Sequence, residues 1–537
     1  MPKWITATRA YLQHPLVGSA YCLVYALAFF LTLTPLFVTE FPPLVDYPVH
    51  LVRQFILLHF DEMPALRANY IVDWGVKPNL AIDLIVPTLS RWLPLLVAGR
   101  VFIALTFLNL LLGTITLSKV IHGRIGLWPL VSLLFMYNAA LYVGLLNFLF
   151  SSGLMLFALA FWIASHSWSS ILRGCVFGLL MTLIFFAHLF PLAALLVSVG
   201  AYEFAVLLKT KRFQFKSLVA LCISGAFLLI LWSLKVQGPP SSNLFFGNLD
   251  VRLISLLSPL MFFRRTDILL FALLILGLIF IWKKGGRISL HSSMTLVLIT
   301  LGLVALVTPK AMMGGDDIQI RLPILLAFIS LGALTPNLIG SRWQWLFVAV
   351  ILVSLAIRSF DVSLEWRRIG GDFEEFRRAA IVMAPGSRVL PLNEMPHQDI
   401  NELAYDHLSD ICLLSSCSFL PHLAKIRDQQ PIGPSLETQA IDGGSVGPIN
   451  LIDFEQGANS EGSATLLHQE FKGWIRPYWA NWPEHFDYVV YIHDHAQKPN
   501  PKASILQLKA QGSFFEIYQI MNGRLQRAES VMCGPVN

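Results

Sequence analysis

Long apolar runs dominate the first 360 residues of the chain, and polar residues are confined to the short gaps between them. A hydrocarbon core about 30 Å thick is crossed by a helix of about 20 apolar residues. Runs that approach this length lie at 16–38, 80–98, 101–118, 126–143, 145–165, 171–187, 189–208, 217–235, 267–282, 293–309, 322–340 and 343–360. The pattern predicts a polytopic α-helical membrane protein.

The pattern changes after residue 360, where the long apolar runs stop. Residues 372–383 have helical periodicity. Short strand-like segments follow at 388–392, 486–492 and 514–520. We therefore predict two domains: a transmembrane domain over 1–360 and a soluble α/β domain over 361–537.

Composition supports this division. The chain is 55% hydrophobic and 13% charged, with a mean hydropathy of +0.63, whereas soluble domains carry about 25% charged residues. Residues 1–360 hold 25 lysines and arginines against 11 acidic residues, and the remainder holds 14 against 22. The net charge of +6 therefore describes no single surface and gives no reason to expect nucleic acid. Membrane lipids are the expected surroundings.

Basic residues indicate the orientation, because positively charged loops stay in the cytoplasm. Lys3 and Arg9 place the N-terminus inside, and basic clusters at 209–216 and 283–287, with Arg342, mark later inside loops. Counting from these loops, the tail falls outside the cytoplasm. We predict a multi-pass protein of the inner (plasma) membrane with an extracytoplasmic C-terminal domain.

The number of spans must then be odd. Twelve crossings would return the tail to the cytoplasm, so one run is not a full span. The run 80–98 carries Asp83, Pro87 and Pro94, and proline interrupts helices. We expect this run to be broken and the total to be eleven or thirteen, with residues 40–79 as the first outside loop.

That first outside loop contains the most informative polar residues. Asp46, His50 and Arg53 recur at spacings of four and three, so a helix that starts near Asp46 places them on one face. Such a helix would lie on the outer membrane interface. The alternative is an N-cap aspartate followed by solvated charges.

An aspartate also enters the next apolar run. An ionisable group at membrane depth costs about 2.5–3.5 kcal/mol, so Asp83 should face a cavity or a charged partner. The alternative to a functional role is a structural ion pair, for instance with Arg91 or Arg100.

The third polar stretch, 310–323, precedes a late apolar run. Arg321 would lie at the outer mouth of a helix, where a guanidinium can bind phosphate oxygens through two parallel hydrogen bonds. The alternative is an arginine that anchors the helix by extending its charge to the interface.

Together these stretches resemble the GT-C superfamily of polyprenyl-phosphate-dependent glycosyltransferases, which includes protein O-mannosyltransferases and lipid A aminoarabinose transferases. The resemblance rests on the acidic first loop, Lys77-Pro78-Asn79, Ala98-Gly99-Arg100, the basic turn from Lys119 to Arg124, Arg321-Leu322-Pro323 and the predicted outer C-terminal domain.

The resemblance implies transfer of a sugar from a polyprenyl-phosphate donor to an acceptor at the outer face, with inversion. Asp46 would take the acceptor's proton, and His50 would support it or act as the base itself. Arg321 would hold the donor's phosphate.

The remaining implied site residues serve substrate or metal binding. Lys310, Arg264 and Arg265 would assist the phosphate site, and Arg53, Lys77 and Asp83 would complete the substrate-binding set. Asp316 and Asp317 are candidate ligands for a divalent cation, Mg²⁺ or Mn²⁺, through carboxylate oxygens.

Two other functions fit the span number. A lipid or solute transporter or flippase commonly has about twelve spans, but typically shows repeated halves with broken helices near the midplane. A noncatalytic membrane assembly protein would use the tail to bind partners. Polar residues gathered at one outer face favour the enzyme.

Overall fold

The computed structural model describes residues 15–234, 244–283, 288–312, 317–336, 341–396, 400–416, 432–434, 449–451, 454–455, 479, 481–494 and 498–521. The chain forms two compact units. The helical unit comprises Met1–Val38 and Ile103–Trp366, and the mixed unit comprises Thr39–Phe102 and Arg367–Asn537. Two long helices, α6 (Leu95–His122) and α16 (Ser341–Ala380), contribute residues to both units.

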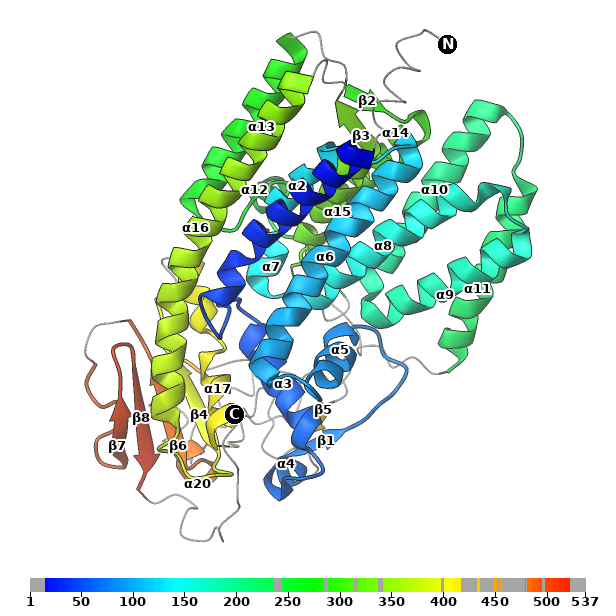
Figure 1. The fold of residues 1–537 in the computed structure, drawn as a ribbon. Coiled ribbons are helices and arrows are strands. Elements are labelled where there is room, and N and C mark those ends of the chain that lie inside the picture. The colour runs from blue at the N-terminus through cyan, green and yellow to red at the C-terminus, as the bar shows by residue number, and fades with distance from the viewer. Residues whose placement is uncertain are drawn as a thin grey trace. The chain divides into compact units, whose positions relative to one another are not determined.

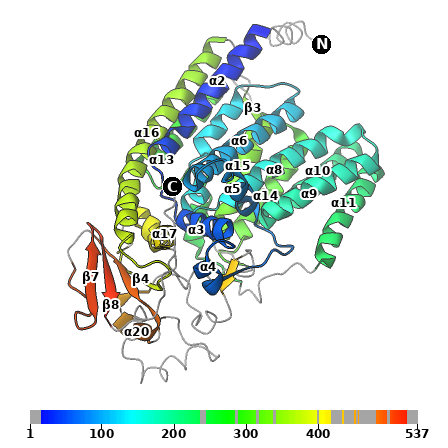
Figure 2. The same cartoon turned by 60° about the horizontal axis from the view of Figure 1, so that its bottom comes forward.

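The helical unit is built from long apolar helices. They are α2 (Pro15–Leu33), most of α6, α8 (Leu146–Ala164), α9 (Ser170–Ala187), α10 (Leu189–Thr210), α11 (Phe215–Ser233), α13 (Arg265–Lys283), α14 (Ser292–Val307), α15 (Ile318–Ala333) and the first part of α16. Shorter elements are η1 (Thr34–Phe37), η2 (Trp128–Phe135), α7 (Ala139–Val143), η3 (Ser165–Ser167), α12 (Leu249–Ser255), β2 (Ile288–Leu290) and β3 (Leu334–Pro336). Figures 1 and 2 show α8, α9 and α10 side by side, and α13 running along α16.

Among the residues that the structure describes, six helices are long and apolar enough to cross a membrane. They cover Ala20–Phe37, Leu95–His122, Leu146–Ser167, Ser170–Ala187, Leu189–Thr210 and Arg342–Ala380. Shorter apolar helices cover Trp128–Val143, Phe215–Leu231, Ser292–Val307 and Ile318–Ala333. These lengths and compositions agree with the predicted helical membrane protein.

The predicted run 126–143 is not one regular α-helix. It forms the 3₁₀-helix η2 and then the short α7. Asn138 adopts an extended conformation and its side chain accepts a hydrogen bond from the Leu141 N–H at 3.0 Å, which starts a new helix. Gly144 then ends that helix with φ +95°, a conformation that costs glycine little.

The mixed unit joins the first predicted outside loop to the tail. Its N-terminal elements are α3 (Tyr47–His59), α4 (Pro64–Asn69), β1 (Tyr70–Val72) and α5 (Ala81–Leu89). The break between α5 and α6 confirms that 80–98 is not a continuous helix. Later elements are the end of α16, β4 (Val389–Asn393), η4 (Ile400–Tyr405), η5 (Leu408–Asp410), α17 (Ile411–Ser416), β5 (Ile432–Pro434), α20 (Trp482–His485), β6 (Tyr488–Ile492), β7 (Leu506–Gln511) and β8 (Phe515–Ile520).

A four-stranded sheet with the order β4-β6-β8-β7 organises the tail. β4 and β6 are parallel, and the other neighbours are antiparallel. All five residues of β6 are buried, which agrees with its sequence of aliphatic and aromatic residues. The predicted strands coincide with β4, β6 and β8, and the predicted helix at 372–383 falls largely within the end of α16. The sequence pattern had not revealed β7.

A second ladder ties the first loop to the tail. β1 pairs antiparallel with β5, with Tyr70 opposite Pro434 and Val72 opposite Ile432. Helix α3 packs on α5 and α17 as well. Residues 39–102 therefore cluster with the tail, and not with the helices on either side of them in the sequence.

Candidate functional site

Helix α3 begins immediately after Asp46. Pro48 occupies its first turn, where a missing N–H costs nothing and the fixed φ suits a helix. The Asp46 side chain makes no capping hydrogen bond to the helix. Its Oδ1 atom instead lies 3.8 Å from Nε2 of His407 in the tail. The alternative role of Asp46, in which its side chain caps the helix, is therefore not seen.

His407 lies between two carboxylates. Its Nδ1 is 3.4 Å from Oδ2 of Asp410, whose side chain is fully buried, while 22% of the His407 side chain is exposed. Burial alone would lower the pKa of His407. The hydrogen bond and charge of Asp410, with the charges of Asp46 and Asp406, outweigh burial and raise the pKa to about 9. At neutral pH His407 is therefore an imidazolium.

These three residues, Asp46, His407 and Asp410, form what we call the carboxylate–imidazolium cluster. Asp46 is its most accessible member, with 39% of the side chain exposed. An exposed carboxylate can accept a proton from a hydroxyl group, and the neighbouring imidazolium can orient it. The cluster is therefore chemically suited to activating a hydroxyl.

Two other polar residues of α3, Arg53 and Gln54, form a buried hydrogen-bonded contact with Asp83 of α5. Arg53 donates two 2.9 Å hydrogen bonds to the carboxylate of Asp83, and Gln54 donates a third at 2.6 Å. Both Arg53 and Asp83 are 1% exposed. The predicted ion-pair alternative for Asp83 agrees with this geometry, but the partner is Arg53 instead of Arg91 or Arg100. The pair joins α3 to α5.

His50 lies beside this pair, with Nδ1 3.4 Å from the Arg53 guanidinium. The predicted sharing of one helix face by His50 and Arg53 is therefore seen. The helix differs from an interfacial one, however, because nine of its thirteen residues are buried. Lys77 is also buried, and its ammonium contacts the carboxylate and carbonyl of Asp73, each at 3.2 Å.

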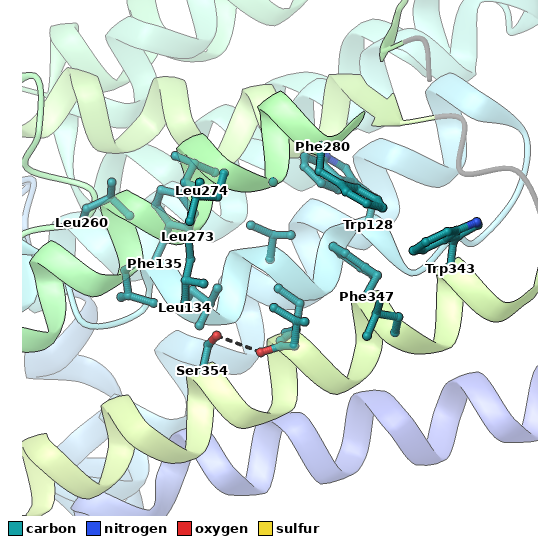
Figure 3. A pocket seen from close by; sticks show the side chains of 17 residues that line it. Trp128, Leu134, Phe135, Leu260, Leu273, Leu274, Phe280, Trp343, Phe347 and Ser354 are labelled. Carbon is teal, nitrogen blue, oxygen red and sulfur yellow. Dashed lines mark hydrogen bonds between the residues drawn. The ribbon is translucent and has the colours of Figure 1, made fainter. Parts of the chain in front are cut away.

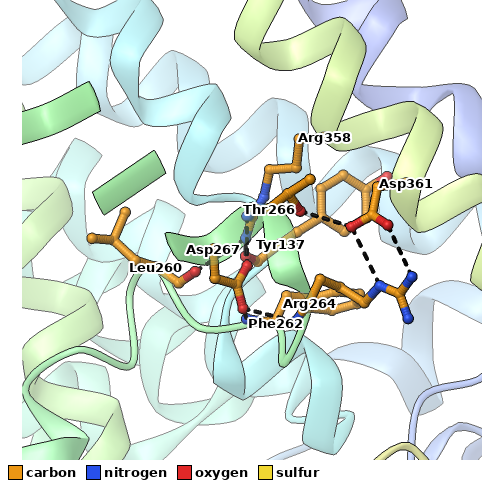
Figure 4. A network of polar contacts seen from close by, with 8 residues as sticks. All are labelled: Tyr137, Leu260, Phe262, Arg264, Thr266, Asp267, Arg358 and Asp361. Carbon is orange, nitrogen blue, oxygen red and sulfur yellow. Dashed lines mark hydrogen bonds and ion pairs between the residues drawn. The ribbon is translucent and has the colours of Figure 1, made fainter. Parts of the chain in front are cut away.

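In the helical unit, Arg264 belongs to a polar network (Figure 4). Its guanidinium pairs with Asp361 at 2.9 Å and with Glu365 at 2.8 Å, so two carboxylates already compensate its charge. The neighbouring Arg265 is exposed at the start of α13. Arg264 is thus a structural residue in this geometry.

A second arginine completes the same network. Arg358, 1% exposed, contacts Asp267 at 2.7 Å and the Leu260 carbonyl at 3.2 Å, and it also donates to the Tyr137 carbonyl. Asp267 in turn accepts the N–H groups of Phe262 and Arg264. The network therefore fixes the loop before α13 against α16.

Arg321 lies in the first turn of α15 and is 8% exposed. Its Nη1 is 3.1 Å from Nε2 of His188, and its guanidinium carbon is 5.9 Å from the centre of the Phe148 ring. The Lys310 carbonyl accepts the Ile318 N–H at 2.9 Å, which places the Lys310 backbone beside the same helix start. An arginine this buried does not fit the alternative given above, an arginine that anchors the helix by extending its charge to the interface.

The predicted metal ligands are only partly described. Asp316 lies outside the described residues. Asp317 precedes α15 with φ +51° and its side chain makes no capping hydrogen bond. Within the described part of the chain, no group of three or more His, Cys, Asp or Glu residues could hold a metal ion.

An apolar crevice of about 400 Å³ lies in the helical unit between η2, α13 and α16 (Figure 3). Aromatic side chains line one part of it. The rings of Trp128 and Phe347 are stacked with their centres 5.9 Å apart, and the ring centres of Phe280 and Trp343 are 5.0 Å apart. The hydroxyl of Ser354 donates to the Val350 carbonyl, so it presents no unsatisfied group. Such a lining is suited to a hydrocarbon chain.

The predicted site residues thus fall into two groups. Asp46, His50, Arg53, Lys77 and Asp83 belong to the mixed unit. Those of the helical unit are Arg264, Arg265, Lys310, Asp317 and Arg321.

Sequence reasoning missed His407 and Asp410. An available signal was the run Asp406-His407-Leu408-Ser409-Asp410, in which acidic residues flank a histidine. His188 was visible in its apolar run, but nothing nearby in the sequence pointed to Arg321.

The chain matches no known protein family model, and no curated protein matches it. Its function is therefore inferred from the chemistry of these residues.

Proposed function

We propose that the protein is a membrane glycosyltransferase that moves a sugar from a polyprenyl-phosphate donor to an acceptor hydroxyl at the outer face of the membrane. The carboxylate–imidazolium cluster is the observation that carries the proposal. It gives Asp46, singled out from the first predicted outside loop, a partly exposed carboxylate beside the imidazolium of His407.

In the proposed reaction, Asp46 accepts the proton of the acceptor hydroxyl as its oxygen attacks the anomeric carbon. The bond between that carbon and the phosphate oxygen breaks, and the electron pair leaves with the polyprenyl phosphate. Attack opposite the leaving group inverts the anomeric centre. His407 is a positioning residue, because its imidazolium lies 3.8 Å from the Asp46 carboxylate and can orient that carboxylate toward the acceptor hydroxyl.

Arg321 binds the donor's phosphate in this proposal. Its burial favours strong interaction with an anion, because a charge is less screened away from water. The apolar crevice would take the isoprenoid chain. Leu260 lines the crevice, and the nearby Ser258 hydroxyl donates to the Ile320 carbonyl, next to Arg321, at 2.9 Å. These contacts bring the segment that lines the crevice next to the first turn of α15, which supports assigning the isoprenoid chain to the crevice and the phosphate to Arg321.

The proposal includes an odd number of spans, eleven or thirteen, and an extracytoplasmic mixed unit. Contacts inside the helical unit support a topology in which successive helices cross the membrane in opposite directions. Lys209 near the end of α10 contacts Ser292 at the start of α14 at 3.1 Å, so these helix ends meet on the side predicted to be cytoplasmic. His188 and Arg321 meet at the starts of α10 and α15, which the same topology places outside.

The test is transfer of radiolabelled sugar from polyprenyl-phosphate pools in membranes at matched expression. Asp46→Asn keeps the side chain's size but removes its basicity, and loss of a general base typically costs 10²–10⁴ in rate. Asp61→Asn, at an exposed position in the same loop, is the matched control and should retain full activity. Arg321→Ala should raise the donor KM.

Undiminished transfer by Asp46→Asn would reject it as the base and direct attention to His50. Absence of transfer by the unmutated protein with every donor sugar would reject the glycosyltransferase proposal and favour a transporter or assembly protein.

A further inference from the structure

His188 is the single residue between α9 and α10. Its backbone is extended, and its ring turns back onto the second helix, where Nδ1 accepts the Phe190 N–H at 3.1 Å. This contact satisfies one of the amides that a helix start leaves without an intrahelical partner. It also fixes the ring so that Nε2 faces Arg321.

In this arrangement two hydrogen-bond donors, one on His188 and one on Arg321, face each other. A neutral imidazole has one acceptor nitrogen, and a guanidinium only donates. If Nδ1 accepts the Phe190 N–H, then Nε2 carries the hydrogen. Nε2 of His188 and Nη1 of Arg321, 3.1 Å apart, are then both donors. The opposite tautomer would move the same conflict to the Phe190 N–H, which the backbone holds in place.

Two neighbouring donors are reconciled when one acceptor oxygen binds to both. We propose that Arg321 and His188 together bind an oxygen of a phosphate group, with Nη1–H and Nε2–H as its donors. The inference rests on the proposed function, in which that phosphate belongs to the polyprenyl donor. His188 becomes a second phosphate-binding residue, which the sequence had not indicated.

The surroundings favour an anion at this place. Phe148 lies against both groups, with its ring centre 5.9 Å from the Arg321 guanidinium carbon and 5.9 Å from the centre of the His188 ring. The aromatic side chain keeps the two donors oriented and excludes water from one side. Hydrogen bonds to a charged group are stronger where water is excluded.

Binding is measured on the full-length protein in detergent by calorimetry, with citronellyl phosphate as a short prenyl phosphate. His188→Phe should weaken its binding tenfold or more, since a hydrogen bond to a charged group contributes about 1.5–3 kcal/mol. His188→Gln, which keeps an N–H donor, should bind within a few-fold of the unmutated protein. Replacing the exposed His166 by Phe is the matched control and should change nothing.

Two further probes identify the group that is bound. Citronellol, which lacks the phosphate, should bind equally to the unmutated protein and to His188→Phe. Inorganic phosphate should compete with citronellyl phosphate in the unmutated protein and less in Arg321→Ala. Equal binding of citronellyl phosphate by folded His188→Phe and by the unmutated protein would overturn the inference.

A measurement on the unmutated protein avoids any folding defect. In ¹⁵N-histidine spectra, with His188 assigned by its absence in His188→Gln, we expect hydrogen on Nε2. Hydrogen on Nδ1 would refute the donor argument. If citronellyl phosphate binding depends on both residues but no sugar is transferred, the site stands and the glycosyltransferase proposal fails. If sugar is transferred and the affinity for citronellyl phosphate does not depend on His188, only this inference fails.

Discussion

Replacing His407 by Gln removes the positive charge from the carboxylate–imidazolium cluster while keeping a polar side chain of similar size. Asp46 lies 3.8 Å and Asp410 3.4 Å from the imidazole nitrogens. Without the imidazolium, their negative charges repel each other across the contact between α3 and the tail. We expect His407→Gln to destabilise this contact.

The size of the effect follows from the pKa. The pKa of His407 rises from 6.5 to about 9, and each pKa unit corresponds to 1.36 kcal/mol, so the stabilisation is roughly 3 kcal/mol. Because the folded-state pKa is raised, this stabilisation is complete below pH 6.5 and is lost as the pH rises through about 9.

Cys412 provides the assay. Its thiol is fully buried in α17, close to the cluster, and burial together with the Asp410 charge raises the pKa of that thiol. With the other five cysteines replaced by serine, alkylation of Cys412 reports local opening. After correction for the thiolate fraction in unfolded protein, His407→Gln should be labelled about a hundredfold faster at pH 6.5, as 3 kcal/mol requires.

The pH dependence supplies the refuting result. The corrected rate of Cys412 alkylation in the unmutated protein should rise progressively between pH 6.5 and 9, whereas the corrected rate in His407→Gln should not change over that range. His59→Gln is the matched control, because the ion pair of His59 with Glu62, at 3.1 Å, is exposed, and such pairs contribute about 0–1 kcal/mol. A flat profile for the unmutated protein would show that the cluster does not hold a stabilising charge.

Three other predictions concern packing, the buried network and topology. A Cβ added at Gly370 would overlap Oγ1 of Thr39, whereas a Cβ added at Gly371 would meet nothing within 4 Å. Gly370→Ala should therefore lower the thermal midpoint, because overpacking costs about 1–3 kcal/mol of stability. Gly371→Ala should raise the midpoint, because alanine has a higher helix propensity than glycine. Equal effects of the two substitutions would contradict the contact with Thr39. Arg358→Met leaves Asp267 without its buried cation and should cost about 3–5 kcal/mol in thermal unfolding, and adding Asp267→Asn should restore part of this. A reporter active only in the cytoplasm, fused after residue 537, should be silent, and its activity would reverse the predicted orientation.

Local patterns were enough to predict much of the fold. Prolines in 80–98 indicated the break between α5 and α6, and short apolar segments marked β4, β6 and β8. The spacing of His50 and Arg53 placed them on one helix face, where their side chains meet. These features depend on neighbours within one or two turns of helix or one strand, and such neighbours leave a periodic signal.

Contacts between distant segments could not be predicted in this way. Asp83 has Arg91 and Arg100 nearby in the sequence, yet it pairs with Arg53 because α3 packs on α5. Arg264 was expected to bind phosphate, but Asp361 and Glu365 of α16 compensate its charge. No periodicity in α3 indicates that a tail histidine will lie beside Asp46. Candidate catalytic residues could therefore be named, whereas their partners required the structure.

The dependence of α3 on the tail has a consequence for biosynthesis. This helix is among the first segments to leave the ribosome, yet α17, which packs on it, is made much later, and so is β5, the partner of β1 in the same unit. At about 5–20 residues per second, the roughly 360 residues between Asp46 and His407 take about 20–70 seconds to synthesise. During that interval the largely apolar face of α3 has no partner from the tail. The nascent chain must therefore be shielded by the membrane or by chaperones, and prematurely terminated chains should be recognised and degraded.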